Sequence, residues 1–515
     1  MEYQGNQNNH HMPVVYIILG VIFFTVIIVA VSMILGYRLN LKENKVDVVG
    51  RLQLNITPND SKVLIDGKEL SWLDGNSISL TEGSHVLEIS KNGYTTWRDQ
   101  VHIKGSSVKW LNVRLFADQI DTKIIKNYPA LLDSNSASHH NFIINQLAKN
   151  EFELVDLNGD EAKYTTLKLN DFYPGADKFD FGFLKWNLEN DSLFFQDLKS
   201  EHKQTILINY KKPKLTVDLT DRYKDSQLTF QDFKITGPNN NLLWLLENQK
   251  LYRINLSASD TQPELIAERV KRYSAIDENK VAFIQDDFLA EKKIQHVQIY
   301  NYKELRYSLV DRVGSEMEID IMANRLDLKD YVIYKRDNHL MVMQAENEFY
   351  NLKSPELVND STDSIYQTFL DLNPNVKTVY SKYFNQATRL IDHNNNQFAV
   401  LATQVQDKNH SDGVVKAGIE WFVYDISNEE SFKFADSSIH DLTSVKANWL
   451  DNAILWHKNE VNSFSTRYFN GRNQITLNNV LPKYAVRFDK SQKNLYYIAN
   501  NQDGSFDLIR AKIIK

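Results

Sequence analysis

Residues 186–195 read WNLENDSLFF: an aromatic residue, a polar turn, and then a run of apolar side chains. The same pattern recurs throughout the C-terminal three quarters of the chain. Seven further apolar runs begin at Phe142, Leu242, Val281, Tyr331, Phe398, Ile454 and Leu495. The mean spacing between copies is about 50 residues. A repeat of this kind means that one supersecondary unit is used again and again.

Short strands recurring at this period are typical of a β-propeller. A helical solenoid has a similar period but requires apolar residues at 3.6-residue spacing, which these runs lack. We therefore predict a propeller of seven or eight blades over 131–515. We also expect a linker at 117–130 whose residues 122–127 close the ring beside the last strand. The repeats and the turn at 501–505 resemble Tol-type propellers and WD-like repeats, a likeness that implies a fold and no activity.

An uncharged apolar segment lies near the N-terminus. Residues 13–36 contain no charged side chain over 24 residues, enough to span roughly 36 Å as a helix. A cleaved signal peptide is the alternative, but its apolar region is shorter and follows a basic region. The first twelve residues contain no Lys or Arg. We therefore predict a polar tail at 1–12 and a single-pass transmembrane helix at 13–36.

The membrane orientation has two conflicting indications. Arg38, Lys42 and Lys45 follow the apolar segment and no basic residue precedes it. The positive-inside rule would place the C-terminal bulk in the cytoplasm, although long domains translocate largely regardless of such charges. The domain type described next favours the outside of the cell.

Residues 50–116, after a linker at 37–49, alternate between apolar and polar side chains with turn residues between the runs, which predicts a small β-sandwich. This segment resembles the PEGA domain. The matching residues are Pro58, Val63, Ile65, Asp66, Gly67, Leu80, Gly83, His85, Leu87, Ile89, Gly93 and Tyr94. The signature tetrapeptide itself is reduced to its proline, in Pro58-Asn59-Asp60-Ser61.

The PEGA resemblance implies a non-catalytic adaptor or spacer of the kind found mostly in extracytoplasmic proteins of bacteria and archaea. We interpret its matching residues as structural. Gly67, Gly83 and Gly93 suit turns that need positive φ. His85 is expected to be a hydrogen-bonded strand residue, because no second metal ligand lies at a plausible spacing.

Composition narrows the classes of function. The chain has 515 residues, no cysteine and a net charge of -7. Thiolate chemistry and disulfides are excluded, and there is no basic excess to favour nucleic acid. Asp156-x-Asn158-x-Asp160 begins like a calcium loop but lacks its later glycine and glutamate, so we predict a hairpin turn there. Motifs of nucleotide-binding loops, zinc proteases and serine hydrolases are absent from the sequence.

These observations predict a mainly β protein that binds or scaffolds. We expect an extracytoplasmic propeller, held at the cell membrane, that meets a protein or an envelope polymer. No catalytic, cofactor-binding or metal-binding residue and no cofactor are predicted. Two alternatives stay open. One is a propeller enzyme, a hydrolase or lyase whose residues come from several blades around a central channel. The other is a membrane-tethered scaffold facing the cytoplasm.

Overall fold

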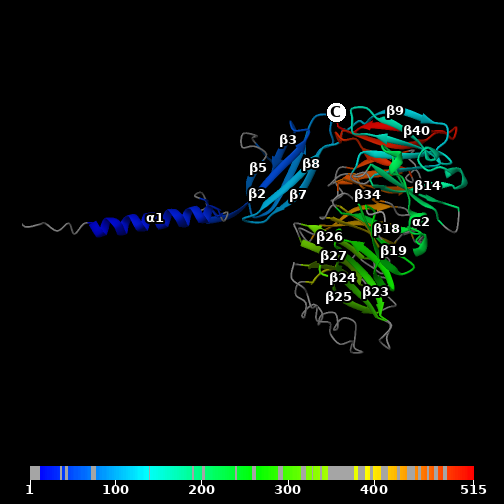
Figure 1. Cartoon of the computed structure of the whole chain (residues 1–515). Helices are drawn as coiled ribbons and strands as arrows, with labels where there is room; N and C mark the ends of the chain where they lie inside the picture. Colours follow the sequence, from blue (N-terminus) through cyan, green and yellow to red (C-terminus); the bar gives the residue numbers. More distant parts are fainter. Residues whose placement is uncertain are drawn as a thin grey trace, which may run out of the picture. The chain divides into compact units, whose positions relative to one another are not determined.

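The structure is a computed structural model. It describes residues 12–34, 37–40, 45–70, 77–137, 140–187, 191–199, 203–237, 241–257, 262–287, 294–314, 321–326, 329–336, 339–345, 376–380, 389–394, 398–407, 416–425, 430–437, 447–450, 454–460, 463–468, 474–478 and 484–514. The chain divides into two compact units, one up to Ile120 and one over Asp121–Ile513. Strands dominate both units (Figure 1).

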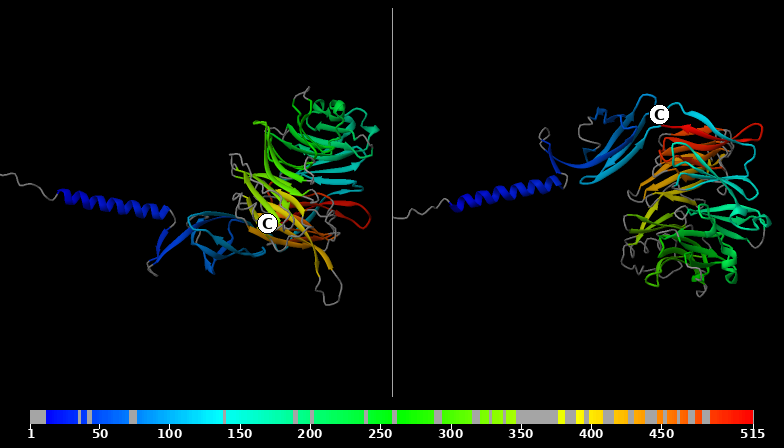
Figure 2. Two further views of the ribbon diagram at one scale, coloured as in Figure 1. Left: turned by 90° about the horizontal axis from the view of Figure 1, so that it is seen from below. Right: turned by 45° about the horizontal axis from the view of Figure 1, so that its top comes forward.

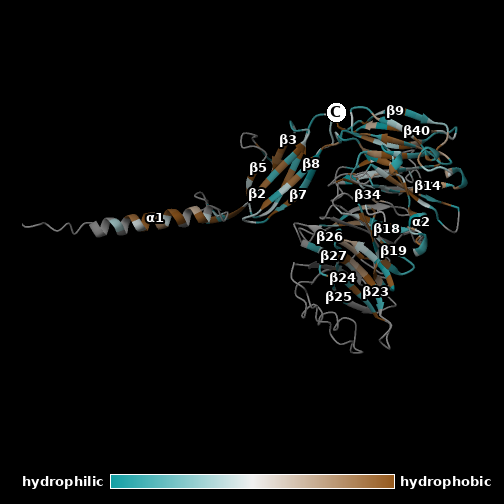
Figure 3. Cartoon of the chain, viewed as in Figure 1, coloured by the Kyte–Doolittle hydropathy of each residue, from teal (hydrophilic) through white to brown (hydrophobic). Residues whose placement is uncertain are grey.

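The first unit begins with helix α1 (Met12–Ile34), which agrees with the helical conformation predicted for most of 13–36 but not with the prediction that this helix spans a membrane. Apolar residues colour much of it brown in Figure 3. When only the described residues are considered, no helix combines the length and the apolarity that crossing a membrane requires.

Two four-stranded sheets follow. In the first, β2 (Lys45–Thr57) pairs antiparallel with β1 (Tyr37–Asn40) and β5 (Ser77–Thr81), and parallel with β8 (Val108–Arg114). The second has the order β4 (Lys68–Glu69), β3 (Lys62–Ile65), β6 (Gly83–Ser90) and β7 (Trp97–Ile103). The segment 37–49, expected to be a linker, instead contains β1 and the start of β2, because the two strands pair as a hairpin.

The core of this small unit follows the strand period of two. Leu52, Leu54 and Ile56 on β2 are buried, while the residues between them are exposed or half-buried. Gly50 lies on the same buried face, and a Cβ there would meet the Ile103 side chain of β7 at 2.6 Å. The close approach of the two sheets therefore requires glycine at position 50.

Among its described residues, the second unit forms eight four-stranded antiparallel sheets. We number them sheets 1 to 8. Sheet 1 contains β10 (Asp133–Ser136), β11 (Phe142–Ala148), β12 (Glu151–Asp156) and β13 (Lys163–Lys168), and sheet 2 contains β14 (Phe181–Asn187), β15 (Ser192–Asp197), β16 (Thr205–Asn209) and β17 (Val217–Asp218). Sheet 3 contains β18 (Asp232–Thr236), β19 (Leu242–Glu247), β20 (Lys250–Asn255) and β21 (Glu264–Glu268), and sheet 4 contains β22 (Val270–Ala275), β23 (Lys280–Asp287), β24 (Ile294–Asn301) and β25 (Arg306–Gly314).

The remaining four sheets continue in chain order until the last. Sheet 5 contains β26 (Ile321–Leu326), β27 (Lys329–Arg336), β28 (His339–Ala345) and β29 (Val376–Tyr380), and sheet 6 contains β30 (Arg389–Asn394), β31 (Phe398–Asp407), β32 (Lys416–Asp425) and β33 (Glu430–Ser437). Sheet 7 contains β34 (Ala447–Trp449), β35 (Ile454–Glu460), β36 (Ser463–Tyr468) and β37 (Ile475–Asn478), and sheet 8 contains β38 (Val486–Phe488), β39 (Asn494–Asn500), β40 (Phe506–Lys512) and β9 (Asp121–Tyr128). Short helices in the connections are η2 (Leu169–Asp171), η3 (Ala176–Lys178), η5 (Pro213–Leu215), α2 (Leu219–Arg222) and η6 (Lys224–Ser226).

Sheet 8 joins the two ends of this unit. Strand β9 pairs with β40, and Asn127 lies opposite Asp507. The predicted pairing of 122–127 with the last strand is thus confirmed. The Asn127 side chain also donates to the Asp507 carboxylate at 2.8 Å.

Each of the eight sequence copies falls on the second strand of one sheet. These strands are apolar on both faces because both faces are covered. On β15, Phe194 packs toward sheet 3 and Phe195 toward sheet 1. On β19, Leu243 packs toward sheet 2 and Trp244 toward sheet 4. A strand between two sheets therefore reads as an apolar run rather than as a strict alternation.

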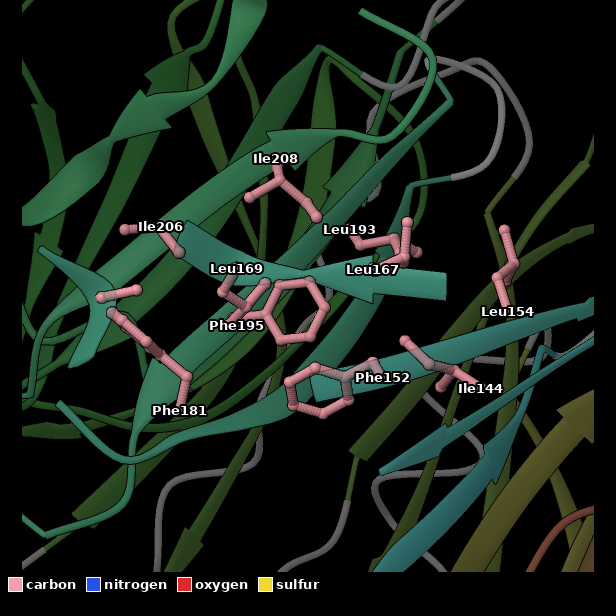
Figure 4. Packing of buried hydrophobic residues seen from close by; sticks show 11 residues of the cluster. Ile144, Phe152, Leu154, Leu167, Leu169, Phe181, Leu193, Phe195, Ile206 and Ile208 are labelled. Carbon is pink, nitrogen blue, oxygen red and sulfur yellow. The ribbon is translucent and has the colours of Figure 1, made fainter. Parts of the chain in front are cut away.

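Apolar clusters of described residues join sheet 1 to 2, 2 to 3, 3 to 4, 4 to 5 and 6 to 7. Figure 2 shows the sheets following one another in chain order. Figure 4 shows the cluster between sheets 1 and 2, where Phe152 and Phe195 meet. Another cluster joins sheet 8 to sheet 1 through Tyr128, Ile143 and Ile498. The last sheet therefore packs against the first.

Candidate functional site

The PEGA-like residues lie on the strands and turns of the small unit. Val63 and Ile65 on β3 are buried, and Tyr94 is buried beside Ala117, with which it forms a bridge. Lys91 Nζ lies 5.4 Å from the centre of the Tyr94 ring. These contacts hold strand ends together.

Of the three glycines of the resemblance, Gly67 and Gly93 occupy turns and Gly83 begins strand β6. Gly67 and Gly93 have φ of +78° and +79°, and Gly83 has φ of +135°. Side chains with a Cβ rarely adopt such values, which explains glycine at these positions. Pro58 follows β2, and its carbonyl accepts a hydrogen bond from the Ser61 hydroxyl at 2.7 Å.

His85 and Asp66 form the most defined polar cluster of this unit. His85 Nδ1 lies 2.7 Å from Asp66 Oδ2, and His85 Nε2 lies 2.8 Å from the Thr81 carbonyl oxygen. The other Asp66 oxygen accepts from the Val86 N–H at 2.8 Å. A carbonyl and a carboxylate both accept, so the arrangement suits an imidazolium that donates from both nitrogens. We call these four residues the His85 clip.

The clip changes the pKa values of its two titrating groups. Burial opposes protonation of His85 and is the largest single influence, but the bonds to Asp66 and Thr81 outweigh it and raise the pKa of His85. The hydrogen bond from His85, followed by the one from Val86, lowers the pKa of Asp66. The clip thus favours the charged form of both side chains and connects the turn after β3 to β6.

The clip predicts a pH-dependent stability of the small unit. The raised pKa of His85 stabilises the fold fully below about pH 6.5, and this is lost as the pH rises through the folded pKa. The lowered pKa of Asp66 contributes above about pH 4, and this is lost as the pH falls through its folded value. We expect His85→Gln to destabilise this unit by about 1 kcal/mol near pH 5.5, since the Asp66 carboxylate is half exposed, and by less near pH 8.5.

Hydrogen exchange of β6 in the full-length protein, at both pH values, measures this effect. His102→Gln is the matched control, because His102 is exposed on β7 and its Nδ1 lies 3.3 Å from the neutral Ser84 hydroxyl. An equal loss of protection at both pH values in His85→Gln would contradict the expectation.

The described residues give no indication of a metal centre. Within them, no three His, Asp or Glu side chains gather closely enough to hold an ion. Both imidazole nitrogens of His85 are engaged in the clip. The Asp156–Asp160 segment joins β12 to β13 as a turn, in which Asp156 accepts from the Asn158 N–H at 2.8 Å.

One face of the small unit combines an exposed aromatic side chain with amides and a guanidinium. Its residues point away from the core on β2 and β8, where Gln53 lies opposite Trp110 and Asn55 opposite Asn112. Trp110 is 70% exposed. We call this surface the Trp110 face and define it by Arg51, Gln53, Asn55, Val108, Trp110 and Asn112.

A buried polar cluster lies where sheet 8 meets sheet 1. Glu153 on β12 is 3% exposed and binds Lys126 and Tyr128, both on β9. The Tyr128 hydroxyl donates to Glu153 at 2.6 Å and accepts from Asn145 at 3.0 Å. Burial, followed by the Glu153 contact, raises the pKa of Tyr128. Lys126 Nζ also lies 4.5 Å from the Tyr164 ring centre. We call this group the closing cluster.

Lys185 is another polar group between neighbouring sheets. It lies on β14, donates to the Phe233 carbonyl on β18, and has its Nζ 4.5 Å from the Phe233 ring centre. Burial, followed by the charge of Lys234, lowers the pKa of Lys185 to about 8. The amine therefore links sheets 2 and 3 and loses its proton at a lower pH than an exposed lysine does.

Sequence reasoning missed the Trp110 face, the closing cluster and Lys185. The strand pattern held the signal for the first. On β8 only Val113 is fully buried. Because successive side chains of a strand point to opposite faces, Trp110 and Asn112 point to the face opposite Leu111 and Val113. The closing cluster left no local signal, because its members come from two sheets.

Comparison with known proteins gives limited likenesses. No curated protein matches the chain. Among solved structures, the tricorn protease is 8% identical with a TM-score of 0.39, over 80% of this chain and 43% of that one. Structures of prolyl endopeptidases are 8% identical with a TM-score of 0.42, over 72% of this chain and 55% of theirs. The chain spans about half the length of these proteins. Residues 49–119 match the PEGA domain family, in agreement with the resemblance at 50–116.

Proposed function

We propose that this protein is a membrane-anchored binding or scaffolding protein of the cell surface. In this proposal α1 is the anchor, the PEGA-like unit is a spacer, and the second unit is an eight-bladed β-propeller that binds a protein or an envelope polymer. The PEGA match supports a place outside the cytoplasm.

The observation that carries the proposal is the exposed apolar surface of α1. A helix that is apolar on all sides needs an apolar environment, either a protein core or a membrane. Large apolar side chains of α1 that are exposed in this chain are Tyr16, Leu19, Val21, Ile22, Phe23, Phe24, Val26, Ile27 and Val31. In this proposal a lipid bilayer covers them, and the sequence of 13–36 carries no charged side chain that would oppose it.

The second unit supports the binding role. Its last sheet packs against the first, and outer strands such as β13, the strand ends and the connections form its surfaces. In folds of this class such connections carry binding residues on a rigid scaffold. The unit therefore offers broad surfaces for a partner whose identity the proposal leaves to experiment.

Membrane topology tests the proposal directly. The chain has no cysteine, so Lys224→Cys introduces a single thiol at a position whose side chain is 70% exposed. We expect a membrane-impermeant maleimide to label this variant in intact cells as strongly as in lysed cells. Labelling only after lysis would overturn the cell-surface placement and favour a scaffold facing the cytoplasm. Fractionation of the same cells with and without residues 13–36 tests the anchor.

A further inference from the structure

Trp110 is unusual because its large side chain contributes little to the core. It is 70% exposed, whereas Trp97 on β7 is 2% exposed. Tryptophan buries more area than most side chains and is enriched where proteins bind partners. The exposed indole therefore needs a reason beyond the packing of the unit.

The neighbours of Trp110 suit hydrogen bonding to hydroxyl groups. The β2–β8 register places Gln53 opposite Trp110 and Asn55 opposite Asn112. Neighbouring strands lie about 4.8 Å apart, so these amides lie near the indole on the same face of the sheet. Amides donate and accept, as the hydroxyls of a sugar do.

The charge of the Trp110 face selects an anionic ligand. Arg51 is exposed there, and its Nε donates to the Ser77 hydroxyl, one of five N–H donors of a guanidinium. No Asp or Glu occupies an outward position on the described β5, on β8, or on β2 from Arg51 onward. The opposite sheet differs, since it carries acidic residues on its outer side that pair with basic ones: Glu69 with Lys62 at 2.9 Å and Glu88 with Arg98 at 3.9 Å.

We propose that the Trp110 face binds an anionic polysaccharide. The indole stacks on the C–H face of a sugar ring, the amides bind hydroxyl groups, and Arg51 binds a carboxylate. The β2–β8 ladder spans seven residue pairs, roughly 23 Å along the strands, which accommodates several sugars of an extended chain. The site lies on the spacer rather than on the second unit. The proposal names anionic polysaccharides as the class of partner, and it rests on the proposed function only for its location at the cell surface.

Binding of oligogalacturonates to the full-length protein in detergent micelles tests the proposal, with calorimetry as the readout. We expect binding by the wild type and a loss of roughly tenfold or more in Trp110→Ala. Arg51→Gln should lose affinity severalfold at low salt and less at high salt, because screening weakens the charge contribution. Arg98→Gln is the matched control on the opposite sheet and should bind as the wild type does.

Two comparisons make the proposal falsifiable. Neutral dextran oligosaccharides should bind much more weakly than oligogalacturonates; equal binding would refute the selection by charge. Polyglutamate has the charge without sugar rings, and if it binds as tightly, the stacking role of Trp110 is refuted. Wild-type affinity in Trp110→Ala would overturn the site itself. These results do not depend on membrane topology, so a failure of the cell-surface placement would be seen separately in the Lys224→Cys labelling.

Discussion

Replacement of Phe195 by alanine should destabilise the second unit by about 3–5 kcal/mol. Phe195 is fully buried between sheets 1 and 2. Its ring centre lies 4.7 Å from that of Phe152 and 5.9 Å from that of Phe183, both in edge-on or near edge-on arrangements. Removal of the ring loses the transfer energy of the side chain, the aromatic contacts and the packing around the resulting cavity.

Calorimetry of the full-length protein measures this loss, and hydrogen exchange of residues 192–209 assigns the transition to the second unit. Phe195→Leu keeps most of the volume and should cost only about 1 kcal/mol. Leu198→Ala, just beyond the same strand at 59% exposure, should change stability by less than about 0.5 kcal/mol. A Phe195→Ala protein as stable as these controls would mean that sheets 1 and 2 do not pack as described.

Lys126→Met should destabilise the junction of sheets 8 and 1 by about 3 kcal/mol. Glu153 is 3% exposed, and without Lys126 its carboxylate would keep only the Tyr128 hydroxyl as a donor named in the closing cluster. A buried charge that loses its partner is more costly than a buried pair that is removed altogether. Breaking a buried ion pair costs about 3–5 kcal/mol. Because the Lys126 side chain is 35% exposed, we expect a destabilisation at the lower end of this range.

The double variant Lys126→Met/Glu153→Gln provides the decisive comparison. Removing the charge of Glu153 as well should restore at least half of the lost stability, as the coupling of the two sites requires. Lys123→Met on the exposed part of the same strand is the control and should be close to neutral. Equal loss in the single and double variants would show that Glu153 is not held by Lys126. Denaturant unfolding with hydrogen exchange of β9 and β40 is the measurement.

The repeats were predictable because burial on both faces changes composition locally. Every copy found in the sequence is a second strand, and strands such as β15 are buried at every position. The outer strands, such as β13, are largely exposed and carry little apolar signal. The apolar pattern therefore marked one inner strand of each sheet, but it did not decide between seven and eight blades.

The structure changed the interpretation of two segments. The expected linker at 37–49 holds β1 and the first residues of β2, since Leu39 and Val46 lie opposite each other in a hairpin. The structure also places Trp110 on β8 with its side chain pointing outward, a residue to which the sequence pattern assigned no role. Alternation shows which face of a strand is buried only when its apolar residues all lie on the same face. On β8 they do not, because Val108 is exposed and Val113 is buried.

The sequence by itself determined the apolar helix, the PEGA-like unit and a repeated strand motif with a partner strand near residue 122. Each follows from the order of residues along a short piece of chain, where period and turn chemistry are local properties. Only the tertiary structure decided that Glu153 meets Lys126, that Phe195 meets Phe152, and that His85 meets both Asp66 and Thr81. These contacts depend on which strands become neighbours and in which register, and strand periodicity is the same for every choice of neighbour.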